Sequence, residues 1–142
     1  MKVMLVTDES INHRGVILLV DDQEMVLEVG KKMLQKLSYK VIMARSGPEA
    51  VEVFAKKQNT IDLVILDMRM PNMNGGVVYE RLKKISPNVK VLISSGYIEN
   101  NSIRDLMNKG CDGFIQKPFS LQELSERIKD ILMNNVNCSG KF

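Results

Sequence analysis

Four points along the chain place a chemically active side chain directly after an apolar run. The side chains at these points are Asp21, Asp22, Asp67, Ser94 and Lys117. In a parallel sheet with right-handed crossovers, the carboxyl ends of the strands meet at one edge, and the functional crevice lies there. If the apolar runs are strands of such a sheet, these side chains come together in one site.

The three carboxylates determine what this site can bind. They repel one another and require a cation, and because no His or Cys lies near them, the ligand set favours a hard ion such as Mg²⁺. The charge of three aspartates is balanced by Mg²⁺ together with Lys117. An acyl phosphate on Asp67 would remove one negative charge and add about two, which the same cations neutralise. The set predicts phosphoryl transfer, which depends on positioning and charge stabilisation.

Each of these residues also has an ordinary structural interpretation. Asp22 fits as the N-cap of a helix that begins at Gln23. Ser94 alone is typical of a turn, and Lys117 followed by Pro118 is typical of a strand exit. Their joint occurrence at four strand ends favours the interpretation as a site.

The sequence also predicts the strands and helices that must position these side chains. Apolar runs of strand length alternate with segments of helical period, which predicts a parallel sheet with helices on both faces. The runs 16–20 and 63–66 are continuous, as in central strands buried on both sides. Residues 41–43, 91–93 and 114–115 supply the other three strands.

Helical stripes separate these strands, with apolar residues at three- and four-residue steps. The predicted stripes are Val26, Val29, Met33 and Leu37; Val78, Leu82 and Ile85; and Leu121, Leu124, Ile128 and Ile131. Two capping boxes predict helix starts, one from Ser46 to Glu49 and one from Ser120 to Glu123. The segment 98–109 is more polar, so it predicts a marginal helix with Ile103, Leu106 and Met107 as its apolar stripe.

Length and composition predict one domain. The chain has 142 residues, of which 44% are hydrophobic, enough to fill a single core. We expect an N-terminal extension or linker at 1–15, the domain at 16–133 and a tail at 134–142. The apolar run 3–6 has the composition of a strand. We do not assign it as the first strand, because no helical segment of adequate length follows it before Val16.

Charge and cysteine content exclude several classes of protein. The net charge is +3, but the lysines are spread over helix faces and aromatic residues are only 5%, so direct nucleic-acid binding is not expected. Cys111 and Cys138 make neither a disulfide framework nor a zinc motif, which favours a reducing cytoplasm. The sequence contains no apolar run long enough for a signal peptide or a membrane span, and no membrane contact by this domain is expected.

The sequence resembles the receiver domains of response regulators, the CheY-like superfamily, over nearly all of 16–133. The matching motifs are Leu-Val-Asp21-Asp22, Leu-Asp67-Met-Arg-Met-Pro71-Asn-Met-Asn-Gly75, Ile-Ser94-Ser-Gly and Gly113-Phe-Ile-Gln-Lys117-Pro-Phe. The resemblance implies a flavodoxin-like α/β fold with five parallel strands in the order 2-1-3-4-5. It also implies a two-component signalling domain, and not an enzyme that acts on a metabolite.

The resemblance assigns a role to each site residue. Asp67 is implied as the phosphoacceptor and as a Mg²⁺ ligand, with Asp22 and the backbone carbonyl of Arg69 as direct ligands. Asp21 is implied to act directly or through water, and Lys117 to pair with the phosphoryl oxygens.

The switch residues implied by the resemblance are Ser94, as the hydroxyl, and Phe114, as the aromatic ring. Together with Lys117 they are implied to act on a surface made by the fourth helix, fifth strand and fifth helix, which also allows a homodimer. The peptide bond between Lys117 and Pro118 is implied to be cis.

The resemblance also indicates the phosphodonor. The sequence is most similar to receivers at the C-terminus of hybrid sensor histidine kinases, so the donor is expected to be a phosphohistidine on a histidine kinase or a histidine phosphotransfer domain. His13 lies on no evident helix, so the donor is expected in another protein or domain.

Three other functions are compatible with parts of this sequence. A phosphohydrolase with an aspartate nucleophile would carry Asp-x-Asp, whereas Asp67 is followed by Met68 and Arg69. A flavin carrier would need a phosphate-cradling loop after Val20, and the sequence lacks one. An interaction module that works without phosphorylation remains open at this point.

Overall fold

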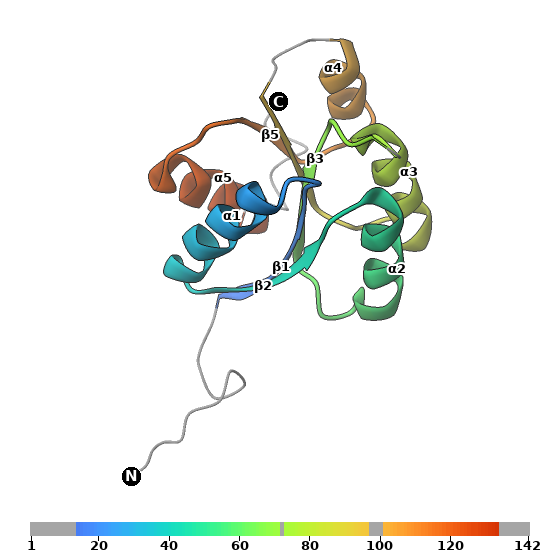
Figure 1. Cartoon of the computed structure of the whole chain (residues 1–142). Helices are drawn as coiled ribbons and strands as arrows, with labels where there is room; N and C mark the ends of the chain where they lie inside the picture. Colours follow the sequence, from blue (N-terminus) through green and yellow to red (C-terminus); the bar gives the residue numbers. More distant parts are fainter. Residues whose placement is uncertain (1–13, 72, 97–100, 134–142) are drawn as a thin grey trace.

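The computed structural model describes residues 14–71, 73–96 and 101–133. Five strands and five helices alternate along this part of the chain (Figure 1). They are β1 Gly15–Val20, α1 Glu24–Lys36, β2 Tyr39–Ala44, α2 Gly47–Lys57, β3 Leu63–Asp67, α3 Gly75–Ile85, β4 Val91–Ser95, α4 Asn101–Asn108, β5 Gly113–Gln116 and α5 Leu121–Met133. Each of the five predicted strands is present.

The strands form one parallel sheet in the order β2-β1-β3-β4-β5. The predicted doubly wound fold is therefore confirmed. Every residue of β3 and β4 is buried, whereas the middle four residues of the edge strand β2 are only half-buried. This pattern explains why the central strands are continuous apolar runs.

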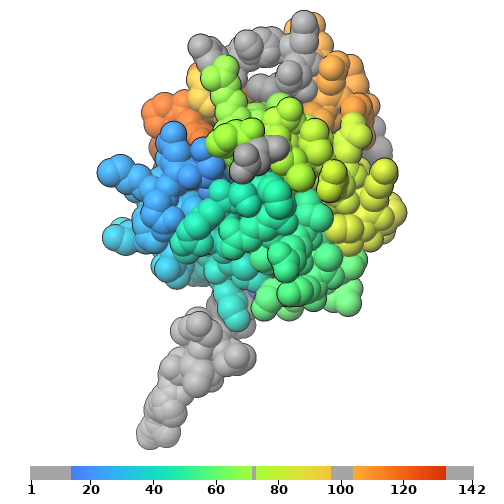
Figure 2. Space-filling model, turned by 45° about the vertical axis from the view of Figure 1, so that its right-hand side comes forward, coloured from blue at the N-terminus to red at the C-terminus, as the bar shows by residue number. Residues whose placement is uncertain are grey.

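Two hydrophobic cores lie on opposite faces of the sheet, because successive side chains of a strand point to opposite sides. Ile17 and Leu19 pack with residues of α1 and α5, whereas Leu18 and Val20 pack with residues of α2, α3 and α4. Figure 1 shows α1 and α5 on one side of the sheet and α2 and α3 on the other. In the space-filling view, α1 (blue) borders the β2–α2 region (teal) (Figure 2).

The predicted buried stripe of α1 is only partly correct. Met33 and Leu37 are half-buried and pack against the core, but Val29 is 57% exposed. The fully buried residues of the helix are Leu27, Gly30 and Leu34. A Cβ atom on Gly30 would lie 3.0 Å from Leu19 Cδ2, so the glycine lets the helix approach β1 closely. The predicted stripes of α3 and α5 are confirmed, with Val78, Leu82, Leu124, Ile128 and Ile131 buried.

Both helix starts predicted from capping boxes are confirmed. Ser46 Oγ accepts the N–H of Glu49 and Ser120 Oγ accepts the N–H of Glu123, at 3.2 and 3.0 Å. The interpretation of Asp22 as a cap is wrong, because α1 begins at Glu24 and its N-cap, Gln23, has no side-chain cap. The marginal helix is present as α4, in which Leu106 is buried and Met107 is 42% exposed; the predicted residues 98–100 and the side chain of Ile103 lie outside the described residues.

Two aspartates hold the opposite, amino end of the sheet. Asp62, directly before β3, accepts the backbone N–H of Val16, and Asp112, directly before β5, accepts that of Val91, both at 2.8 Å. Each carboxylate therefore connects its own strand to the start of the neighbouring one. Within the described ranges, no helix combines the length and the apolar character that crossing a bilayer requires.

Candidate functional site

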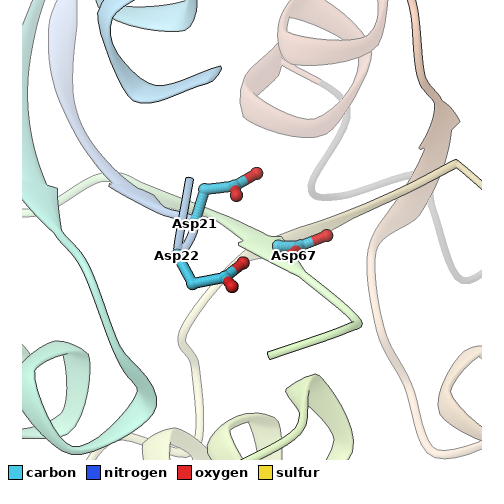
Figure 3. Close-up of side chains that lie close together, drawn as sticks. All are labelled: Asp21, Asp22 and Asp67. Carbon is cyan, nitrogen blue, oxygen red and sulfur yellow. The ribbon is translucent and has the colours of Figure 1, made fainter. Parts of the chain in front are cut away.

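The predicted side chains gather at the carboxyl edge of the sheet. Asp21 and Asp22 directly follow β1, Asp67 ends β3, Ser94 lies in β4, and Lys117 directly follows β5. Three aspartates lie close together there, as Figure 3 shows. Carboxylate oxygens of Asp21, Asp22 and Asp67 all lie within 4.8 Å of one another. The structure thus unites residues that are up to 96 positions apart in sequence.

Lys117 bridges two of the carboxylates. Its Nζ atom lies 2.8 Å from Asp21 Oδ2 and 3.1 Å from Asp67 Oδ1. Asp21 and Asp67 are 3% and 4% exposed. Since buried charges must be paired, the ammonium compensates the two buried carboxylates.

The third carboxylate differs from the other two in its partners. Asp21 Oδ1 also accepts the N–H of Gln23 at 3.0 Å, so both of its oxygens are engaged. Asp22 is exposed, and it has no hydrogen bond or ion pair with the residues that the structure describes. Its oxygens are therefore the most available to a cation.

Burial dominates the electrostatics of Asp67. Desolvation raises the pKa of this carboxyl to about 6 from its ordinary value of 3.8, against the opposing effects of Lys117 and a backbone hydrogen bond from Arg69. The pKa of Lys117 is also raised: its burial opposes the charged form, but the combined hydrogen bonds and charges of Asp21 and Asp67 outweigh it. The site is thus a basic carboxylate next to a firmly protonated amine.

Ser94 and Phe114 lie on the neighbouring strands. Ser94 is paired in register with Asp67 and is 5% exposed. The half-buried Phe114 packs against the core on the α2–α3–α4 face, and its carbonyl oxygen accepts a hydrogen bond from Arg127 of α5. The peptide bond between Lys117 and Pro118 is cis, as the resemblance implied.

Sequence reasoning gave no role to Gly75, which the structure places against the site. A Cβ atom there would lie 2.8 Å from both the Asp67 carbonyl oxygen and the Met68 Cα atom. The N–H of Gly75 donates to the Met68 carbonyl oxygen at 3.0 Å. The absence of a side chain therefore lets α3 start directly beside the strand that carries Asp67. The signal for Gly75 in the sequence was its position at the end of the matching motif that contains Asp67.

A largely apolar cavity of about 430 Å³ borders the site. Asp21, Ser94 and Lys117 line its inner end. The rest of its wall comes mainly from apolar residues of α1 and of the segment after β5, among them Met25, Val26, Val29, Met33 and Phe119. Met25 is 76% exposed, so α1 presents apolar surface to solvent beside the carboxylates.

Comparison with known proteins supports the same interpretation. The model of the response regulator receiver domain matches residues 17–129. Sensor kinase CckA of Brucella abortus is 36% identical over 131 residues, which are 92% of this chain but only 14% of the kinase. The chain thus spans a small part of that relative. Sporulation initiation phosphotransferase F of Bacillus subtilis is 32% identical over 82% of this chain and 92% of its own length.

A solved structure agrees with the fold. A response regulator receiver domain protein from Clostridium thermocellum has a TM-score of 0.82 and 30% identity, covering 86% of this chain and 97% of its own. The sequence and the fold of this chain thus agree with those of receiver domains along most of its length. This chain belongs to the response regulator receiver family, the phosphoacceptor signalling domains of two-component systems.

Proposed function

We propose that Asp67 accepts a phosphoryl group from a phosphohistidine, with Mg²⁺ bound by the aspartate cluster. The observation that carries this proposal is the cluster itself: three carboxylates within 4.8 Å of one another, two of them bridged by Lys117. Such an arrangement brings a nucleophile, a cation site and an ammonium to one point.

The donor set fits Mg²⁺. All ligand atoms are oxygens, as this ion prefers, and a charge of −3 is only partly offset by Lys117. We assign Asp22, Asp67 and the backbone carbonyl of Arg69 as direct ligands, and Asp21, whose oxygens are already engaged, as a ligand that acts directly or through water. When bound, the ion would neutralise charge on the phosphoryl oxygens.

The transfer exchanges one bond for another. A carboxylate oxygen of Asp67 attacks phosphorus, the bond from phosphorus to the histidine nitrogen breaks, and the departing imidazole takes a proton from solvent. In the metal-free site burial raises the pKa of Asp67 to about 6, which leaves it mostly ionised at neutral pH, and bound Mg²⁺ would favour the ionised, nucleophilic form further. Lys117, already 3.1 Å from Asp67, would pair with the arriving phosphoryl oxygens.

A protein phosphodonor is favoured by the surface around the site. The apolar cavity adjoins the carboxylates, and α1 exposes Met25 and Val29 beside it. An apolar face of a histidine kinase or histidine phosphotransfer domain could cover these side chains while its phosphohistidine reaches Asp67. We propose that neither nucleic acid nor a membrane contacts this domain.

We propose that Ser94 and Phe114 couple phosphorylation of Asp67 to a change in the surface of α4, β5 and α5. When the Ser94 hydroxyl closes on the phosphoryl group, it vacates space that the Phe114 ring can enter, which shifts an equilibrium between two packings. The half-buried position of Phe114 leaves the ring room to move. The surface of α4, β5 and α5 would then change, and two phosphorylated copies could pair through it.

Residues 16–133 are proposed as the working unit, with 1–15 as an extension or linker and 134–142 as a tail. The domain assists its own phosphorylation and dephosphorylation but turns over no metabolite. The cysteine content of the sequence favours a reducing compartment, so we place this activity in the cytoplasm.

Labelling with acetyl phosphate and Mg²⁺ tests the proposal. The wild type should gain one phosphoryl group by intact mass, and hydroxylamine should remove it because an acyl phosphate is reactive. Asp67→Asn should gain none, whereas Asp130→Asn, on the exposed side of α5, should match the wild type. Undiminished labelling of Asp67→Asn would mean a different acceptor, and an unlabelled wild type would favour a module that works without phosphorylation.

A further inference from the structure

An ion pair outside the aspartate cluster connects the start of α1 with the loop that follows β2. Arg45 Nε lies 2.7 Å from Glu24 Oε1, and Arg45 Nη2 lies 3.1 Å from Glu24 Oε2, so the pair is bidentate. Glu24 is the first residue of α1, two positions after Asp22. Arg45 directly follows Ala44, whose carbonyl oxygen accepts the N–H of Asp21 at 3.2 Å.

Arg45 is held both through its backbone, by Glu49, and through its guanidinium, by Glu24. The backbone N–H of Arg45 donates to Glu49 Oε1 at 2.8 Å, which ties the β2–α2 loop to the first turn of α2. The side chain reaches across to α1, and Figure 2 shows these two regions, teal and blue, side by side. Both partners are about half exposed, at 47% and 56% of their side chains, and such pairs contribute little to stability. Stability alone therefore does not account for this geometry.

The position of the pair gives it an electrostatic consequence. Residues two positions apart have Cα atoms at most about 7 Å from each other, so the backbone of Glu24 lies within about one Debye length of the backbone of Asp22. Unpaired, the Glu24 carboxylate would be a fourth negative charge beside Asp21, Asp22 and Asp67. Paired with Arg45, it adds almost no net charge.

We propose that Arg45 is a specificity-determining residue of the phosphoacceptor site, because it masks the charge of Glu24. Masking favours entry of strongly anionic phosphodonors and limits the attraction of the site for Mg²⁺. This inference rests on the proposed role of Asp67. It predicts that loss of Arg45 slows phosphorylation by strongly anionic donors and at the same time strengthens Mg²⁺ binding.

The test compares Arg45→Gln, Glu24→Gln and the double variant at low ionic strength. In Arg45→Gln, the Mg²⁺ dissociation constant by calorimetry should fall about two- to threefold and phosphorylation by acetyl phosphate at saturating Mg²⁺ should slow by a similar factor. Phosphorylation by phosphoramidate, which carries less negative charge, should change less. In Glu24→Gln both quantities should move the opposite way, and the double variant should return close to the wild type.

A matched control separates the effect of position from that of charge. Lys56→Gln breaks the exposed Glu52–Lys56 pair, 3.5 Å long, at the far end of α2 and removes the same net charge. It should leave both quantities unchanged, and about 1 M salt should remove the effects of Arg45→Gln. The proposal is overturned if the two single variants shift Mg²⁺ affinity in the same direction, or no further than the control. The Mg²⁺ measurement requires no phosphorylation, so it remains informative even if Asp67 is not the acceptor.

Discussion

Lys117 Nζ lies 3.1 Å from Asp67 Oδ1, although their strands, β5 and β3, are separated by β4. The lysine side chain therefore reaches over the end of β4, where Ser94 lies. Any group that arrives at Asp67 meets the ammonium and the hydroxyl together. The contact between Lys117 and Asp67 therefore links the proposed phosphoacceptor to β4 and β5, the strands that carry the proposed switch residues Ser94 and Phe114.

Mg²⁺ should stabilise the unphosphorylated domain, because it relieves repulsion among three carboxylates. At a concentration about tenfold above the dissociation constant, the gain is about 1.4 kcal/mol, measurable as a rise in Tm. Asp22→Ala should lose most of this rise, since Asp22 has the most available oxygens. A metal-dependent rise as large in that variant as in the wild type would contradict the ligand assignment.

Without metal, the free energy of unfolding should fall mainly as the pH rises from 3.8 to about 6. Because the folded-state pKa of Asp67 is raised to about 6 from 3.8, its contribution is fully present below pH 3.8 and is lost as the pH rises through 6. The total is about 3 kcal/mol, of which about 2 should be lost between about pH 4.5 and about pH 8. Urea unfolding in EDTA should show a smaller loss for Asp67→Asn than for the wild type. Equal losses in the two proteins would exclude Asp67 as the cause.

Ser94→Ala should still accept the phosphoryl group but should transmit less of the resulting structural change to the surface of α4, β5 and α5. The variant should still bind beryllofluoride at Asp67, because the nucleophile and the cation site are intact. Its amide chemical-shift changes across residues 101–119 should be much smaller than in the wild type, since the hydroxyl that closes on the phosphoryl group is missing. Shifts of wild-type size throughout that segment would refute the coupling but not the acceptor.

Gly75→Ala should damage both stability and phosphorylation. The added methyl group would lie 2.8 Å from backbone atoms of Asp67 and Met68, which cannot move without shifting the acceptor, and overpacking of this kind costs about 1–3 kcal/mol. Gly76→Ala is the matched control, because its nearest contact is Asn74 Oδ1 at 3.3 Å and alanine favours the helix. Urea unfolding and acetyl phosphate labelling would distinguish the two. Equal behaviour would show that the close approach at Gly75 is not needed.

The sequence was sufficient to predict the strands and the side chains at their ends. Continuous apolar runs have few structural alternatives to buried strands. Because the carboxyl ends of parallel strands share an edge of the sheet, the sequence alone predicts that Asp22, Asp67 and Lys117 lie close together. The close approach at Gly75 and the pairing of Arg45 with Glu24 could not be predicted, because both depend on contacts between loops.

The error in α1 has a physical cause. Two apolar stripes run along this helix, and periodicity alone cannot tell which one faces the sheet. The core stripe includes Gly30, which carries no hydrophobic side chain but fits against Leu19. The other stripe, with Val26 and Met33, lines the cavity beside the site. A sequence pattern records that a face is apolar, not what covers it.

The carboxylates of Asp62 and Asp112 make the two ends of the sheet differ in how their strands are held together. Each accepts a backbone N–H near the start of the neighbouring strand, Val16 of β1 or Val91 of β4, so the amino ends of these strands are joined in pairs by side chains as well as by the ladder. The carboxyl ends carry acidic groups that repel one another. The amino edge of the sheet is thus fixed by neutral backbone groups hydrogen-bonded to carboxylates, whereas the side-chain arrangement of the carboxyl edge depends on the charges gathered there.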